Sequence, residues 1–249
     1  MESKLVTYNK SHYTVMANDI VKGKQEMTLT EARIIRLLIT QVVKEDTDLK
    51  TYMCRIQDLA SFLNIPPNNL YRDVKTICEN LLKRIVRINI NDGKGSWEAF
   101  QWVQYAKYDG NTGTIILKLS EQIAPYVLEL NSWFTQYRLE NILEFNSFYA
   151  IRLYELLKCE EGIARDYRYE FIFNIDYLRE IFCCEKKFIK NNDFTTKVIM
   201  TGVREINAKS DIEIDFEPIK SGRKITSLKF YLSYNIKNNF KRKTELNYE

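Results

Sequence analysis

The spacing of hydrophobic residues predicts the same order of elements twice, once before residue 95 and again after residue 140. Each copy predicts a helix that contains Ile-Arg-Leu, a shorter helix, a turn, a longer helix with a polar face, and a strand hairpin. The two Ile-Arg-Leu motifs, at residues 35–37 and 151–153, lie 116 residues apart, and the matching Leu59 and Leu178 lie 119 residues apart. A nearly constant offset indicates two similar domains rather than one large fold.

The first copy begins with a predicted scaffold helix. Thr28 and Glu31 form a capping-box pattern, which satisfies backbone donors at a helix start, so the helix should begin near Thr30. A broad apolar stripe of helical period follows and predicts a helix that packs against the core. The stripe comprises Ile34, Ile35, Leu37, Leu38, Ile39, Val42 and Val43.

A short helix, a proline turn and a longer helix come next. Residues 56–63 predict the short helix, which Pro66 and Pro67 end because proline has no N–H to donate. Asn68 is the expected cap of the longer helix. The polar face of that helix suits a DNA groove, since Asn and Arg can read base edges while Lys and Thr can hold phosphates. An ordinary solvated face is the alternative. The candidate DNA contacts are Asn68, Asn69, Arg72, Lys75, Thr76 and Lys83.

The first copy ends in predicted strands at residues 85–90, 97–108 and 114–119. The glycine-rich residues 109–113 should join the last two strands as a hairpin. Helices followed by an antiparallel hairpin describe a winged helix. Aromatic residues of these strands could stack on bases, although packing within the sheet is the favoured interpretation. These residues are Trp97, Phe100, Trp102, Tyr105 and Tyr108.

The second copy follows the same plan with a different turn. Asn146 is the expected cap of its scaffold helix, Gly162 the expected end, and residues 167–173 alternate as a strand. Asn174 can cap the short helix that follows. Residues 185–192 then predict a turn that is longer and more basic than the one in the first copy.

The longer helix of the second copy, residues 193–209, should bury Phe194, Val198, Ile199, Val203 and Ile206. Recognition helices touch bases mainly through their N-terminal turns. Asn192, Thr196 and Lys197 are therefore the candidate base readers, and Arg204 is a candidate phosphate contact. Lys187, Lys190 and Thr201 complete the candidates around this helix.

A hairpin of strands at residues 212–216 and 225–232 closes the second copy. Its tip carries Lys220, Arg223 and Lys224, and such a tip can follow the phosphate backbone or enter a minor groove. A solvated hairpin turn is the alternative. The basic residues 237–243 that follow could meet phosphates or be disordered, with disorder the favoured interpretation.

Composition limits the kinds of protein this chain can be. The net charge of +4 is too small to indicate nucleic-acid binding, so the arrangement of charges must supply any DNA surface. Five cysteines, an odd number, do not suggest the disulfide framework of a secreted domain. The N-terminus lacks the apolar segment of a signal peptide, and no run approaches membrane-spanning length. We therefore expect a cytoplasmic protein with no membrane partner.

Three motifs resemble one protein family. They are Val15-x-x-Asn18-Asp19-Ile20 followed by Met27-Thr28-Leu29-x-Glu31-x-Arg33, the helix at residues 149–157, and Ile219-Lys220-x-Gly222-Arg223-Lys224. Together, residues 15–234 resemble the Rep initiator proteins of iteron-bearing, theta-replicating plasmids, which have twin winged helices. The expected fold is α+β, with winged helices at residues 1–135 and 136–249 related by a pseudo-repeat.

The resemblance also implies a function. Members of this family bind tandem repeats, the iterons, in the double-stranded DNA of their plasmid's origin, help open an adjacent AT-rich duplex, and recruit the host initiator and helicase. Their monomers typically start replication, while homodimers joined through the N-terminal winged helix repress the rep gene and limit copy number.

The motifs of several enzymes are missing from the sequence. Rolling-circle initiators need a His-x-His type metal site, and the chain has one histidine, His12. There is no phosphate-binding G-x-x-x-x-G-K-[ST] motif, and Cys183-Cys184 lacks the paired ligands of a zinc site. We expect a non-enzymatic DNA-binding protein without a cofactor, metal site or catalytic residue. A transcriptional repressor without a replication role, and a scaffold whose second winged helix binds protein, are the alternatives.

Overall fold

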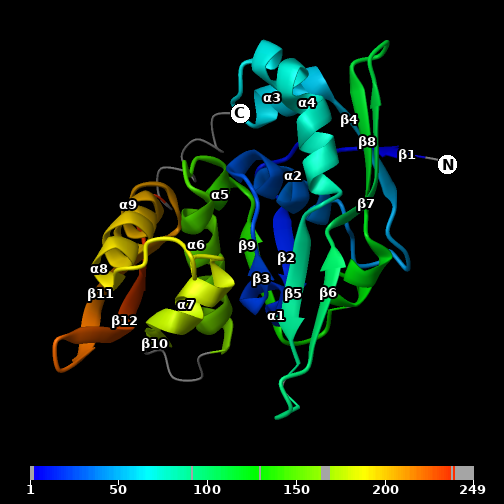
Figure 1. Cartoon of the computed structure of the whole chain (residues 1–249). Helices are drawn as coiled ribbons and strands as arrows, with labels where there is room; N and C mark the ends of the chain where they lie inside the picture. Colours follow the sequence, from blue (N-terminus) through cyan, green and yellow to red (C-terminus); the bar gives the residue numbers. More distant parts are fainter. Residues whose placement is uncertain (1–2, 91, 129, 164–168, 237, 239–249) are drawn as a thin grey trace. The chain divides into compact units, whose positions relative to one another are not determined.

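The computed structural model describes residues 3–90, 92–128, 130–163, 169–236 and 238 (Figure 1). It divides into two compact units, Met1–Leu139 (unit 1) and Glu140–Glu249 (unit 2). The expected boundary after residue 135 falls inside strand β9 (Phe134–Arg138), which pairs with β2 (Tyr13–Ala17) of unit 1. In the basic tail, residue 237 and residues 239–243 lie outside the described residues. No helix in the described ranges is long and apolar enough to span a membrane.

Unit 1 combines a winged helix with additional strands. Its helices are α1 (Asn18–Lys22), α2 (Leu29–Ile39), α3 (Ile56–Phe62), α4 (Pro67–Leu81) and a 3₁₀ helix (Glu121–Tyr126). Its strands, besides β2 and β9, are β1 (Ser3–Leu5), β3 (Lys24–Gln25), β4 (Thr51–Arg55), β5 (Ile85–Asn89), β6 (Trp97–Gln101), β7 (Val103–Asp109) and β8 (Thr114–Leu119).

The winged helix of unit 1 consists of α2, β4, α3, α4 and the β7–β8 hairpin. Strand β8 lies between β4 and β7 in the sheet β1-β4-β8-β7, so the wing is hydrogen-bonded to the strand that leads into α3. The additional strands form the β2–β9 pair and the sheet β3-β5-β6. The sequence did not predict β4, whose side chains are largely buried and do not alternate.

The start of the scaffold helix α2 confirms the capping-box prediction. The Thr28 N–H donates to Glu31 Oε2 (2.8 Å), and the Glu31 N–H donates to the Thr28 hydroxyl (3.3 Å). The predicted stripe is wrong at its end, because α2 stops at Ile39 and Val43 is 46% exposed. The side chains of Thr40 and Gln41 both donate to the Leu37 carbonyl, which ties up a last-turn acceptor and competes with continued helix.

The arginines of the two Ile-Arg-Leu motifs are buried. Arg36 Nη2 donates to Gln25 Oε1 (3.0 Å), and its guanidinium lies 5.3 Å from the centre of the Trp102 ring. Arg152 pairs with Glu155 one turn further along its helix (3.2 Å). The repeated motif is therefore structural, since it places a charged side chain in the core of each unit.

The predicted strand at residues 97–108 is wrong, because two strands of different sheets meet at Trp102. β6 pairs with β5, whereas β7 pairs with β8. Between them the Trp102 ring is fully buried, the backbone N–H of Trp102 donates to the Arg84 carbonyl, and the Trp102 carbonyl accepts from the Ser120 N–H. The hairpin turn at residues 109–113 is confirmed.

Unit 2 has the same winged-helix plan, with the sheet order β10-β12-β11. The chain order is α5 (Glu140–Leu143), α6 (Phe148–Ile163), β10 (Glu170–Asn174), α7 (Ile175–Ile181), α8 (Asn191–Phe194), a π-helical turn (Thr195–Ile199), α9 (Met200–Lys209), β11 (Ile212–Ser221) and β12 (Lys224–Tyr234).

One of the two predicted helix caps of unit 2 is correct. Asn174 caps α7, because its side chain accepts from the Asp176 N–H (2.7 Å). Asn146 is not the cap of α6, since the Ser147 hydroxyl accepts from the Tyr149 N–H instead (3.2 Å). Gly162 lies inside α6, which extends to Ile163. The strand expected at residues 167–173 is β10, and residues 167 and 168 lie outside the described ranges.

Candidate nucleic-acid interface

Helix α4 presents the predicted contact residues of unit 1 on its surface. The helix begins at Pro67, so Asn68 is not its cap but part of its first turn, where a proline with fixed φ starts the helix. Leu70, Val74, Cys78 and Leu81 are buried against the unit. The opposite side is exposed and carries Asn68, Asn69, Arg72, Lys75 and Thr76, while Lys83 is exposed just beyond the helix.

Arg72 has a partner on its own helix. Its Nε and Nη2 donate to the Asp73 carboxylate at 2.8 and 2.9 Å, and this contact holds the pKa of Asp73 below its usual range. A DNA base or phosphate would compete with Asp73 for the guanidinium. The sequence prediction missed this neighbour, although Asp73 is adjacent in the chain.

The wing of unit 1 packs against α4. Lys75 Nζ lies 6.0 Å from the centre of the Tyr108 ring on β7. At the hairpin turn Gly113 has a φ of 61°, and a Cβ there would lie 2.8 Å from the Tyr71 hydroxyl of α4. Tyr71 is a surface residue that the sequence prediction did not single out. Glycine at this turn lets the recognition helix and the wing form one surface.

In unit 2 the corresponding helix runs through α8, the π turn and α9. It begins at Asn191 rather than Asp193, and Phe194, Val198, Ile199 and Ile206 are buried as predicted, while Val203 is half-buried. Asn192, Thr196, Lys197 and Arg204 are exposed and Thr201 is half-buried. A π turn inside an α-helix is rare and is frequently found at functional sites.

The basic turn before this helix is next to the predicted base readers. Lys187 and Lys190 are exposed there, as is the neighbouring Lys186. Lys197 Nζ, on the helix, lies 6.0 Å from the centre of the ring of Phe188, which is in the turn. The Phe188 ring also makes an edge contact with Tyr149. The candidates of the turn and of the helix therefore form one surface.

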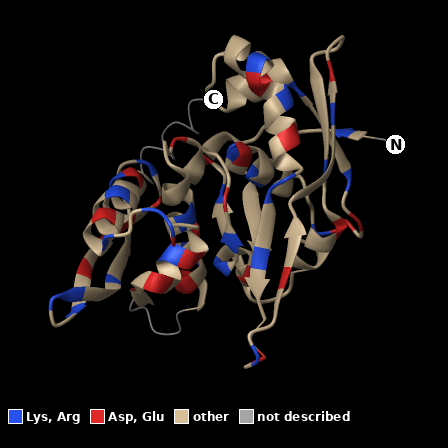
Figure 2. Ribbon diagram, in the orientation of Figure 1, with Lys and Arg blue, Asp and Glu red and all other residues tan. Residues whose placement is uncertain are grey.

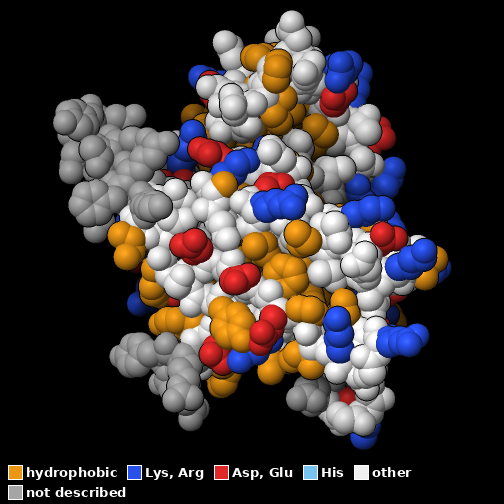
Figure 3. Space-filling model, turned by 90° about the vertical axis from the view of Figure 1, so that its left-hand side faces the viewer, with side chains coloured by type: hydrophobic (Ala, Val, Ile, Leu, Met, Phe, Trp, Pro, Cys, Tyr) orange, Lys and Arg blue, Asp and Glu red, His pale blue; other side chains and the backbone are white. Residues whose placement is uncertain are grey.

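The two wings differ in charge. The β11–β12 hairpin ends in Lys220, Arg223 and Lys224, all exposed, around Gly222 with a φ of 60°. Figure 2 shows this cationic end of the hairpin. The β7–β8 tip at residues 109–113 has one aspartate and no lysine or arginine. Elsewhere charges of both signs are mixed among hydrophobic side chains, as on the face drawn in Figure 3.

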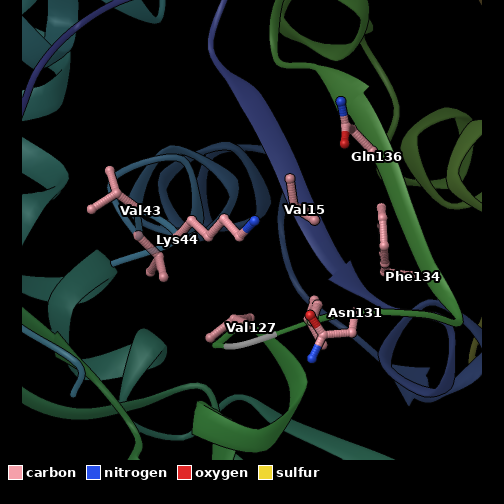
Figure 4. Close-up of a pocket in the computed structure, with 9 residues that line it drawn as sticks. Val15, Val43, Lys44, Val127, Asn131, Phe134 and Gln136 are labelled. Carbon is pink, nitrogen blue, oxygen red and sulfur yellow. The ribbon is translucent and has the colours of Figure 1, made fainter. Parts of the chain in front are cut away.

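A cavity of about 510 Å³ lies in unit 1 (Figure 4). Its lining residues are largely apolar, and the Lys44 side chain extends toward Val15 of β2. None of the predicted DNA contacts lines the cavity. It is lined by Val15, Val42, Val43, Lys44, Val127, Leu130, Asn131, Phe134 and Gln136.

Two winged helices, each with an exposed polar helix beside a hairpin, define a tandem winged-helix protein of the kind that binds nucleic acid. The family described as "Initiator Replication protein, WH1" matches residues 13–158, and "Initiator Rep protein, WH2" matches residues 174–232. The chain belongs to this family of plasmid replication initiators. The predicted family and the α+β fold of two tandem winged helices are thereby confirmed.

Two known proteins are similar to this chain over most of its length. A "Replication initiation protein" from Escherichia coli is 23% identical over 228 residues, which cover 92% of this chain and 69% of that protein. The solved structure described as "Crystal structure of Pi initiator protein in complex with iteron DNA" has a TM-score of 0.75 and 21% identity, and the match covers 92% of this chain and 99% of that one. The second similarity shows a shared fold.

Proposed function

We propose that this initiator binds tandem repeats in a plasmid origin through both units and acts without enzymatic chemistry or a cofactor. The observation that carries the proposal is the recurrence, in each unit, of an exposed polar helix face beside a hairpin. A recognition helix enters a major groove, and two such helices placed one helical turn apart would read one face of the duplex. The Pi initiator protein, which shares the fold, was solved in complex with iteron DNA, and this supports the same ligand.

Unit 2 is the stronger DNA-binding unit in this proposal. Its surface joins a basic turn, a helix with Lys197 and Arg204 exposed, and a wing tip with three cations. Unit 1 has a wing tip without cations, and its exposed Arg72 is already bound by Asp73. Unit 1 would add sequence contacts through α4 and serve as the dimerisation unit.

The wider role follows from family membership. We propose that binding promotes opening of an adjacent AT-rich duplex and recruits the host initiator and helicase in the cytoplasm. Monomers would start replication, in equilibrium with homodimers that repress the gene for the protein.

A footprinting experiment on the plasmid's own origin tests the proposal. The expected footprint on one repeat covers about two helical turns, because two recognition helices occupy successive major grooves. A footprint of a single turn that persists when unit 1 is deleted would contradict the use of both units.

The sequence of the bound site and the salt dependence of binding distinguish the alternatives. A lone palindrome as the bound site, without tandem repeats beside an AT-rich segment, would favour a transcriptional repressor. Binding that changes little with salt would favour a protein-binding scaffold, since phosphate contacts lose affinity steeply as salt rises.

A further inference from the structure

The turn between α7 and the recognition helix of unit 2 surrounds one buried side chain. In unit 1 the equivalent turn is short and contains Pro66, whereas in unit 2 residues 182–190 separate the helices. Arg179, in the last turn of α7, is 6% exposed and donates hydrogen bonds to this segment. The acceptors are the carbonyl oxygens of Cys184 (3.4 Å), Lys187 (3.0 Å), Phe188 (2.7 Å) and Ile189 (3.3 Å), and Asn191 Oδ1 (3.1 Å).

Only an arginine suits this arrangement. Its planar guanidinium carries five N–H donors in a fixed fork, while a lysine ammonium has three donors at a single point. The guanidinium also lies 4.7 Å from the centre of the Phe194 ring, at the start of the recognition helix. One side chain therefore fixes the basic turn and contacts the first turn of the helix.

The turn needs such a partner because its backbone is strained. Cys183 and Phe188 have φ values of 52° and 51°, in the left-handed region that bulky residues rarely adopt. Such conformations persist when surrounding contacts hold them. The position of Phe188 matters for the interface, since its ring lies beneath the ammonium group of Lys197.

Asn191 extends the network to the wing. While its Oδ1 accepts from Arg179, its Nδ2 donates to the Ile225 carbonyl of β12 (2.8 Å). Ile225 directly follows Lys224 of the cationic tip. The chain of contacts thus links the basic turn, the recognition helix and the wing.

We infer that Arg179 is a positioning residue, which through the carbonyls of the turn and through Asn191 holds the basic turn, the recognition helix and the wing in one DNA-binding geometry. This inference rests on the proposed function. It applies to unit 2 alone, because Ala60 stands at the matching position of unit 1, 119 residues earlier. Arg179 itself is buried and does not need to touch DNA.

The test compares the full-length wild type with Arg179→Met, Arg179→Lys and the control Lys229→Met. Lys229 is on β12 of the same unit, pairs with Glu170 and lies outside the network, so its variant matches the change in charge. Affinity for repeat DNA and for random DNA is measured over a range of salt concentrations, at a temperature where circular dichroism shows each variant folded.

Arg179→Met should weaken binding to repeat DNA by about tenfold to a hundredfold, with a smaller specificity ratio and a shallower salt slope. Arg179→Lys should recover part of the affinity, and Lys229→Met should match the wild type. A folded Arg179→Met protein with wild-type affinity and slope would overturn the inference. If that variant does not fold, a folded Arg179→Lys variant indistinguishable from wild type would do the same. A wild type that does not bind repeat DNA would instead contradict the proposed function.

The link to the wing has its own test. If Asn191 positions the wing, Arg223→Ala should weaken repeat binding less in an Asn191→Ala background than in the wild type, because contacts within one network are not additive. Equal losses of DNA affinity in both backgrounds would show that Asn191 does not position the wing.

Discussion

The ion pair between Arg84 and Glu31 predicts how firmly the recognition helix of unit 1 is held to its scaffold helix. Arg84 follows α4, and its guanidinium binds the Glu31 carboxylate of α2 with two contacts, at 2.7 and 3.2 Å. The Glu31 side chain is 1% exposed and that of Arg84 is 27% exposed. Arg84→Met therefore leaves a buried carboxylate with the Thr28 N–H as a remaining donor.

Breaking a buried pair by removing one partner typically costs about 3–5 kcal/mol, and the partial exposure of Arg84 lowers our expectation to about 2–4 kcal/mol. Urea unfolding followed by tryptophan fluorescence measures this loss selectively, because Trp97, Trp102 and Trp133 are the three tryptophans of the chain and all lie in unit 1. With a typical urea dependence for a domain of this size, the midpoint should fall by about 1–2 M.

A double-mutant cycle separates the pair from general damage to the fold. Glu31→Gln and the double variant complete the cycle, and the double variant should lose less stability than the two single losses combined. A loss below about 0.5 kcal/mol for Arg84→Met would refute the reasoning, since it would mean that water or another group solvates Glu31 equally well.

Three further predictions concern DNA binding, packing and pH. Lys197→Ala should weaken binding to repeat DNA by about 1–3 kcal/mol and alter the sequence preference. Arg223→Ala should instead weaken binding to repeat and random DNA alike and reduce the salt slope by about one. Binding titrations at several salt concentrations check both predictions. Gly202→Val should lower the melting temperature, because a Cβ added at Gly202 would lie 3.1 Å from Leu153 Cδ2. Gly162→Ala should raise the melting temperature, because open space surrounds this helical position. The opposite order of melting temperatures would contradict this packing. Burial raises the pKa of the Cys54 thiol to about 12 and that of the Cys78 thiol to about 11, from an ordinary value of 9.0. The contribution of these thiols to the stability of unit 1 should therefore be full below pH 9.0. It should be lost as pH rises toward 11–12, because the thiols of the unfolded chain lose their protons first. Replacing both cysteines with alanine should flatten that decline.

The sequence predicted those features that depend on local periodicity and local caps. Thr28 with Glu31, and Asn174 with Asp176, are caps whose partners lie within three residues, and both form as expected. The proline turn before α4 and the wing turn at residues 109–113 follow from residues with restricted or unusual φ values.

Features that depend on contacts between residues distant in the sequence could not be predicted from the pattern of hydrophobic and polar residues. Trp102 divides what looks like one strand because Arg84 and Ser120 provide its backbone partners. Arg36 and Arg152 resemble surface residues of a helix, yet their partners bury them. The candidate DNA contacts were predicted from their polar side chains and helical spacing, whereas Arg179 was not singled out because a buried arginine has no signal in periodicity.

The π turn in the recognition helix of unit 2 affects how this surface can change during evolution. A π turn accommodates one more residue in a single turn than an α-helix does, so removing that residue would restore ordinary winding and leave the residues on either side on nearly the same faces of the helix. Asn192 and Arg204 would then keep nearly the same orientation relative to each other, although the helix between them had become one residue shorter. The π turn at residues 195–199 is thus a place where the recognition helix can gain or lose one residue during evolution while its buried and exposed faces stay where they are.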